Sequence, residues 1–193
     1  MIINRELRLE RATEADALFL FDLKNEEGAR LSALATKGHI TWTEHVAWLH
    51  KTLVDADVDL YTIRDADNKF IGSWRYDFHP EHVECALVMI PEVRGRRIGS
   101  TVVNFCFDYI QSRTGKKIIE HIAEGNVPPM RYHIKAGFQL ESYDRVRKCY
   151  TWTRDMAAFH SRQRSQLLPI SAESYGVQDA DGNSSEHQSD AAI

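Results

Sequence analysis

The sequence of 193 residues is poor in cysteine, has no long apolar run and carries no excess of positive charge. Its three cysteines, Cys85, Cys106 and Cys149, lack Cys-x-x-Cys spacing, which argues against a disulfide framework and a zinc knuckle. No apolar run approaches the length that spans a bilayer, and residues 1–8 are too charged for a signal peptide. A net charge of −4 gives no general basis for binding nucleic acid. We therefore expect a soluble cytoplasmic protein with buried cysteines and neither nucleic acid nor a membrane as its partner.

Hydrophobic residues nevertheless make up 43% of the chain, enough to build the core of one domain. Strand-like and helix-like patterns follow one another through residues 1–158. Residues 159–193 contain few side chains whose burial would offset the entropy of ordering. We therefore expect one mixed α/β domain of the α+β type over residues 1–158, followed by a polar, disordered tail over residues 159–193.

Apolar periodicity and turn residues divide the domain into short strands and amphipathic helices. Thr13 and Thr41 are typical helix N-caps, and Glu44 is spaced to complete a capping box with Thr41. Strands are expected over residues 7–9, 60–63, 70–78, 83–90, 117–122, 138–143 and 148–153. The apolar positions expected to face the sheet are Leu18 and Phe21 in the first helix, Val46, Leu49 and Leu53 in the second, and Ile98, Val102, Phe105 and Tyr109 in the third.

The segment 93–100 links an apolar strand to an amphipathic helix through a basic turn that contains Gly95 and Gly99. A diphosphate binds well where backbone N–H groups meet the positive end of a helix, and glycines let its oxygens approach the amides closely. The alternative is a basic surface turn in front of an ordinary helix. The predicted phosphate-binding residues are Arg94, Gly95, Arg96, Arg97, Ile98, Gly99 and Ser100.

A second motif, over residues 126–138, begins with an asparagine and ends in Gly-Phe. Together the two segments resemble the GCN5-related N-acetyltransferases (GNAT). In that superfamily an Arg/Gln-x-x-Gly-x-Gly/Ala turn binds the pyrophosphate of acetyl-CoA, and a later Asn-led helix flanks the pantetheine arm. The resemblance implies the GNAT fold, with a mixed, mostly antiparallel sheet flanked by helices, and acetyl-CoA as acyl donor. The matching positions are Arg94, Gly99, Asn126, Gly137 and Phe138.

Two positions depart from the family pattern. Arg97 replaces the middle glycine of the turn, which is a mild change if only its amide is used. His133 stands where many relatives carry the tyrosine that protonates the leaving thiolate, and Tyr132 precedes it. An imidazole can release a proton near neutral pH, so His133 and Tyr132 are the predicted general acids. The alternative is that both are ordinary packed residues.

Glu84 is the predicted general base, because the resemblance places a glutamate with that role at the start of the strand over residues 83–90. Strand alternation puts it on one face with Ala86 and Val88, and apolar neighbours make a carboxylate a stronger base. The alternative is a strand-end carboxylate in water. No metal is expected, because the histidines show no ligand spacing. Where the next strand splays away, free N–H groups are expected to contact the thioester and pantetheine, at Leu87, Val88 and Met89.

A finer resemblance, to the branch that acetylates nucleotide-linked 4-amino sugars in pathways such as pseudaminic acid biosynthesis, is carried by the segments 22–25, 40–49 and 71–76. The predicted acceptor contacts are His45, Trp48, Trp74 and Arg75. His45 and Trp48 are three residues apart and so share a helical face, expected to lie away from the core. The preferred acceptor is a nucleotide-linked amino sugar. Other acceptors are left open: an amine of a protein or peptide, a polyamine or a drug. Also left open are a CoA-binding module without catalysis and a homodimer.

Overall fold

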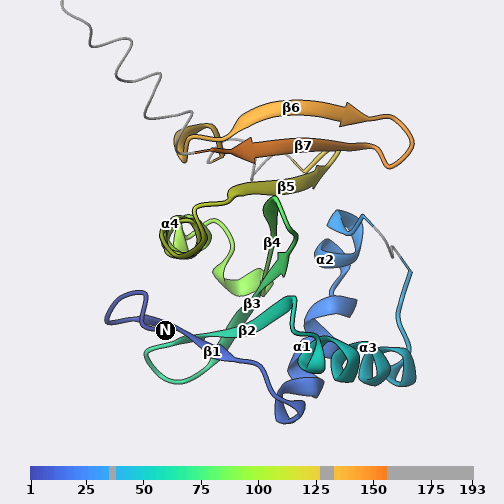
Figure 1. Cartoon of the computed structure of the whole chain (residues 1–193). Helices are drawn as coiled ribbons and strands as arrows, with labels where there is room; N and C mark the ends of the chain where they lie inside the picture. Colours follow the sequence, from blue (N-terminus) through green and yellow to red (C-terminus); the bar gives the residue numbers. More distant parts are fainter. Residues whose placement is uncertain (35–37, 127–132, 156–193) are drawn as a thin grey trace, which may run out of the picture.

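The computed structural model describes residues 1–34, 38–126 and 133–155 (Figure 1). Residues 127–132 of the expected Asn126 helix, Tyr132 among them, and the 159–193 tail with its boundary lie outside these residues. The elements are β1 (Leu7–Arg11), the 3₁₀ turn η1 (Glu14–Asp16), α1 (Ala17–Asn25), α2 (Glu27–Ser32), α3 (Trp42–Val54), β2 (Val58–Asp65), β3 (Phe70–Phe78), β4 (His82–Met89), η2 (Pro91–Val93), α4 (Ile98–Thr114), β5 (Lys117–Ala123), β6 (Gln139–Asp144) and β7 (Cys149–Arg154).

The strands form one seven-stranded sheet in the order β1-β2-β3-β4-β5-β7-β6. Every neighbouring pair is antiparallel except β4 and β5, which are parallel. The expected mixed, mostly antiparallel sheet flanked by helices is therefore confirmed. Within the described residues, no helix has the length and apolar character needed to cross a membrane.

Helices cover both faces of the sheet, and neighbouring buried residues of one strand pack in different clusters on its two sides. Tyr61 and Ile63 of β2 pack in the large core cluster with the α4 residues. Leu60, the residue next to Tyr61 along β2, packs instead with Leu20 of α1 and Leu49 of α3. Adjacent strand residues point to opposite faces, so α4 lies on one side of the sheet and α1 with α3 on the other. Figure 1 shows this separation.

The helix caps agree with the sequence, whereas the buried helix faces agree only in part. The Thr41 hydroxyl accepts from the Glu44 N–H at 3.3 Å, and the Glu44 carboxylate accepts from the Thr41 N–H at 2.7 Å, completing the capping box. Leu18 and Val46 were expected to face the sheet, but they are 64% and 41% exposed. The buried face of α4 consists of Val102, Val103, Cys106, Phe107 and Ile110, so of the four positions expected there only Val102 is fully buried.

The three cysteines are buried and unpaired, as expected from their number and spacing. Burial raises the pKa of the Cys106 thiol to about 12 and also raises that of Cys85. Cys85 and Cys106 are therefore packing residues, because a thiol kept protonated is a poor nucleophile.

Candidate functional site

The central feature of the site is a break in strand pairing between β4 and β5. Their parallel pairing runs only from His82 opposite Lys117 to Glu84 opposite Ile119. Beyond Glu84, β4 continues to Met89 against β3, while β5 turns away and pairs with β7 (Figure 1). One edge of β4 from Cys85 to Met89 therefore has no strand beside it in the described structure, and Leu87, Val88 and Met89 lie on this open stretch.

The glycine-bearing turn follows β4 after the short 3₁₀ turn η2. Gly95 and Arg97 both have left-handed backbone conformations, with φ of 75° and 63°. α4 then begins at Ile98, and the residue before it, Arg97, makes no side-chain cap bond to the helix. The first amides of α4, at Ile98, Gly99 and Ser100, therefore remain available to an anion at the positive end of the helix dipole.

Arg94 is occupied by protein partners. Its guanidinium donates to the carbonyl oxygen of Met89 at 2.8 and 3.0 Å and to the Glu26 carboxylate at 2.5 Å. The same carboxylate caps α2 by accepting from the N–H groups of Gly28 and Ala29. Arg94 thus joins the turn to the end of β4 and to the start of α2, a role the sequence motif did not indicate.

The Glu26–Arg94 pair is ionic over the practical pH range. The hydrogen bond from Arg94, assisted by the two capping N–H groups, lowers the pKa of Glu26 from 4.5 to about 2. A carboxyl with a depressed pKa stabilises the fold above its unfolded pKa, and this contribution is lost as the pH falls from about 4.5 to about 2. A Cβ on Gly28 would lie 2.6 Å from Arg94 Nη1, so the glycine gives the guanidinium room.

The left-handed backbone of Arg97 explains why a glycine is typical of this motif position. Glycine adopts positive φ freely, whereas an ordinary side chain there costs about 1–2 kcal/mol and a β-branched one is a stronger outlier. We expect Arg97→Asn to retain most of the acetyl-CoA affinity of wild type, because asparagine tolerates this conformation. Arg97→Val should bind acetyl-CoA about tenfold more weakly than Arg97→Asn. Both variants remove the same charge. Calorimetric titration measures the difference, and equal affinities would show that the backbone conformation is unimportant.

Glu84 lies at the last paired position, where β4 and β5 begin to separate. Its Oε1 is 3.5 Å from His82 Nε2 and 3.7 Å from the Nε2 atoms of His79 and His121. The side chain is 37% exposed. The expectation of an apolar neighbourhood is therefore wrong: three imidazoles surround the carboxylate, because a hairpin and the neighbouring strand bring them to its face. The spacing His79-x-x-His82-x-Glu84 was a signal for this cluster that the sequence analysis missed.

His133 is fully buried, and its Nε2 contacts the Glu120 carboxylate. Phe107, Phe138 and Trp152 surround its ring. This placement favours the packed-residue alternative over proton donation to a thiolate, because the imidazole is inside the core.

Two of the four predicted acceptor contacts are core residues. His45 is fully buried and its Nε2 lies 2.9 Å from the Ala17 carbonyl oxygen; with Leu49 it lies on the buried face of α3. Trp74 is fully buried on the α4 side of the sheet. Arg75, its neighbour in β3, must point to the other face, so the two cannot line one site. The predictions for His45 and Trp74 are therefore wrong.

Trp48 and Arg75 do come together, with a third residue that the sequence analysis did not select. Lys24 Nζ lies 3.0 Å from the centre of the Trp48 ring, and the Arg75 guanidinium lies 6.0 Å from it. Burial, with Arg75 nearby, lowers the pKa of Lys24 to about 8. Arg75 also binds Asp77, whose partner across the β3–β4 ladder is Glu84. The group Lys24–Trp48–Arg75 therefore lies on the same face of the sheet as Glu84.

A parallel strand pair that separates beside a glycine-bearing anion turn is the architecture of a CoA-dependent acyltransferase. The family model described as the acetyltransferase (GNAT) family matches residues 20–138. The chain belongs to this family and is an acetyl-CoA-dependent N-acetyltransferase. Comparison with curated proteins gives no match.

Solved structures with the same fold are distant in sequence. The spermidine N-acetyltransferase from Vibrio cholerae in complex with CoA and spermine has a TM-score of 0.68 at 19% identity, over 78% of this chain and 94% of that one. A domain from Methanocaldococcus jannaschii has a TM-score of 0.68 at 16% identity, over 76% and 96% of the two chains. A dodecameric structure of the Vibrio cholerae spermidine enzyme has a TM-score of 0.67 at 19% identity, over 82% and 99%.

Proposed function

We propose that this protein transfers the acetyl group of acetyl-CoA to a primary amine of a small molecule, with Glu84 as the general base. The observation that carries the proposal is the position of the Glu84 carboxylate, at the point where β4 and β5 part. The open edge extends from there to Met89, about 16 Å at the usual rise per strand residue. The phosphate turn follows at its far end. A CoA arm bound along this edge would bring its thioester toward Glu84.

We assign a group to each remaining part of the reaction. The N–H groups of Leu87 and Met89 point to the open edge and hold the thioester oxygen as it becomes negative, whereas the N–H of Val88 points toward β3. The first amides of α4 hold the pyrophosphate. Asn126, whose N–H donates to the Ala123 carbonyl oxygen at 3.0 Å, lies just beyond the end of β5 and is proposed to border the pantetheine arm. With His133 inside the core, Tyr132 is the proposed acid that protonates the thiolate.

Two acceptor classes have specific support. Solved structures similar to this chain include enzymes that acetylate spermidine, which favours a polyamine. Lys24 and Arg75 beside Trp48 favour an anionic acceptor such as a nucleotide-linked amino sugar, because two cations attract a diphosphate and repel a polyammonium ion. Asp77 neutralises Arg75 in part, so Lys24 is the charge that most strongly favours an anionic acceptor over a polyamine.

Acceptor-dependent release of CoA from acetyl-CoA tests the proposal. The panel contains spermidine and spermine, UDP- and dTDP-linked amino sugars, a basic peptide and an aminoglycoside, with the acetylated product identified by mass spectrometry. Turnover with a polyamine or an amino sugar supports a small-molecule acceptor and selects its class. Turnover with the peptide alone contradicts it. Acetyl-CoA binding without turnover across the panel favours a binding module without catalysis.

Replacing Lys24 by methionine distinguishes the two acceptor classes. At about pH 7 we expect KM for a nucleotide amino sugar to rise about fivefold, or KM for spermidine to fall about fivefold, from the loss of one nearby charge. Because the pKa of Lys24 is about 8, the side chain loses its charge above that pH and the difference from wild type shrinks. Lys51→Met, at an exposed position of α3, removes the same charge elsewhere and is the control. If Lys24→Met has the same KM as wild type both at about pH 7 and above the pKa of Lys24, the acceptor binds away from Lys24.

A further inference from the structure

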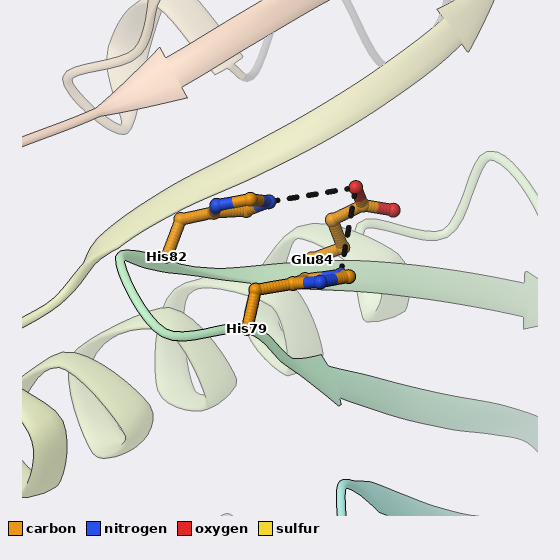
Figure 2. Close-up of side chains that lie close together, drawn as sticks. All are labelled: His79, His82 and Glu84. Atoms are coloured by element: carbon orange, nitrogen blue, oxygen red, sulfur yellow. Dashed lines mark ion pairs between the residues drawn. The ribbon is translucent and has the colours of Figure 1, made fainter.

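Three groups that bind metal ions well meet at the hairpin between β3 and β4 (Figure 2). His79 and His82 face each other across the turn, which is closed by a 3.0 Å hydrogen bond from the His79 N–H to the His82 carbonyl oxygen. Glu84 follows two residues along β4 on the same face as His82. Lys116 Nζ donates to the His79 carbonyl oxygen at 2.7 Å and ties the hairpin to the segment before β5. The backbone thus holds the three side chains together.

The separations between these groups are too long for good hydrogen bonds and are close to those between ligands of one metal ion. Glu84 Oε1 lies 3.5 Å from His82 Nε2 and 3.7 Å from His79 Nε2, and the three ligand atoms all lie within 4.8 Å of one another. Hydrogen bonds from nitrogen to oxygen span about 2.7–3.2 Å. Two ligands that each lie about 2.1 Å from a tetrahedral ion are about 3.4 Å apart.

His79 Nε2 is shielded from solvent and has no hydrogen-bond partner among the described residues. Leaving a buried polar atom unsatisfied is costly, and a metal ion would satisfy it. The two imidazole rings stack 4.4 Å apart with an angle of 15° between their planes. One ring must therefore turn about its Cβ–Cγ bond to aim its lone pair at a shared ion. The His79 side chain is 43% exposed, which leaves that rotation open.

We propose that His79, His82 and Glu84 form a binding site for one divalent transition-metal ion such as Zn²⁺. Two imidazoles and a carboxylate suit this ion, whereas Mg²⁺ and Ca²⁺ prefer oxygen ligands. Water takes the fourth position. His121 lies on the other strand, with its Nε2 3.7 Å from Glu84 Oε1 and its Nδ1 3.2 Å from Thr151 Oγ1. It is not among the three residues whose ligand atoms all lie within 4.8 Å of one another.

The ion is expected to inhibit acetyl transfer. This consequence rests on the proposed function, because a carboxylate oxygen that ligates a metal ion is not free to accept a proton from the amine. Bound Zn²⁺ and acetyl transfer therefore compete for Glu84. The binding site itself is independent of that role and is tested separately.

Binding is measured by titrating chelator-treated protein with Zn²⁺ against a chromophoric indicator, and with Co²⁺ followed by its d–d absorption. We expect Zn²⁺ to bind His79→Asn and His82→Asn more weakly than wild type by at least the roughly 10- to 100-fold that the loss of an outer-shell partner costs, with the tetrahedral Co²⁺ spectrum lost. His50→Asn, at an exposed position of α3, removes an imidazole elsewhere and is the control. Circular dichroism and the thermal midpoint confirm that the variants fold.

The outcomes separate the site from its consequence. Zn²⁺ affinity that is the same in wild type, His79→Asn and His82→Asn overturns the site. In the activity assay, acetylated product is counted by mass spectrometry, because the CoA thiol itself binds Zn²⁺. Inhibition of wild type that disappears in His82→Asn, each compared with its own metal-free rate, supports the competition for Glu84. Specific binding without inhibition leaves the site standing and contradicts Glu84 as the base.

Discussion

Glu84→Gln is expected to lower kcat by about 10²–10⁴-fold, the usual contribution of a general base. Glutamine has nearly the same shape but does not accept the proton that the acceptor must lose, either from its ammonium before the amine attacks or from the intermediate that forms. Acetyl-CoA affinity should stay within about threefold of wild type, because the predicted cofactor contacts are backbone groups of β4 and α4 rather than this side chain. Steady-state kinetics with the accepted amine and calorimetric titration of acetyl-CoA measure the two quantities, both with a chelator present to remove metal ions.

Glu81→Gln is the matched control for this variant. Glu81 is exposed on the same hairpin and carries the same charge, so its loss should leave kcat nearly unchanged. An equal effect of both substitutions would indicate a general electrostatic contribution of the hairpin. Unchanged turnover in Glu84→Gln would remove Glu84 from the mechanism while leaving the phosphate turn and the open strand edge unaffected.

Local sequence signals predicted the fold well because they depend on neighbouring residues. The Thr41 capping box, the turn before α4 and the strand positions were all readable from spacing. Side-chain facing was less predictable. Ile98 and Phe105 have a helical spacing, yet the sheet packs against the adjacent stripe through Val103 and Phe107, because tertiary contacts select which stripe is buried.

Site contacts that join distant segments were not predictable from either segment alone. The Glu26–Arg94 pair spans 68 residues, and no local pattern couples these positions. His121 reaches Glu84 only because β5 is parallel to β4 at this register. By contrast, the choice of both Trp74 and Arg75 as acceptor contacts was avoidable. Adjacent residues of a strand point to opposite faces of the sheet, so the sequence alone excludes that both line one site. The side His45 faces could not be predicted from α3 alone. Its imidazole is inside the core because its polar atom has a partner there, the Ala17 carbonyl oxygen of another helix.

Arg94→Glu is expected to weaken acetyl-CoA binding by about 100-fold or more. The reversal places a carboxylate opposite Glu26 and removes the bonds to the Met89 carbonyl oxygen, so the turn loses its anchors on β4 and α2. It also adds negative charge where the pyrophosphate is proposed to bind. Calorimetric titration measures the affinity, and circular dichroism checks the fold. Retained affinity would contradict the phosphate-turn assignment itself.

Glu26→Ala separates the two ways in which Arg94 can act. If Arg94 positions the turn by pairing with Glu26, removing the carboxylate weakens acetyl-CoA binding, by about three- to tenfold for the loss of one partly exposed ion pair. If Arg94 instead binds the pyrophosphate and Glu26 competes for it, the same substitution strengthens binding. We expect weakening, because the guanidinium keeps its bonds to the Met89 carbonyl oxygen and is held beside the strand end rather than released toward the cofactor. Glu27→Ala, at the exposed neighbouring position, removes an equal charge without touching Arg94 and should leave the affinity unchanged.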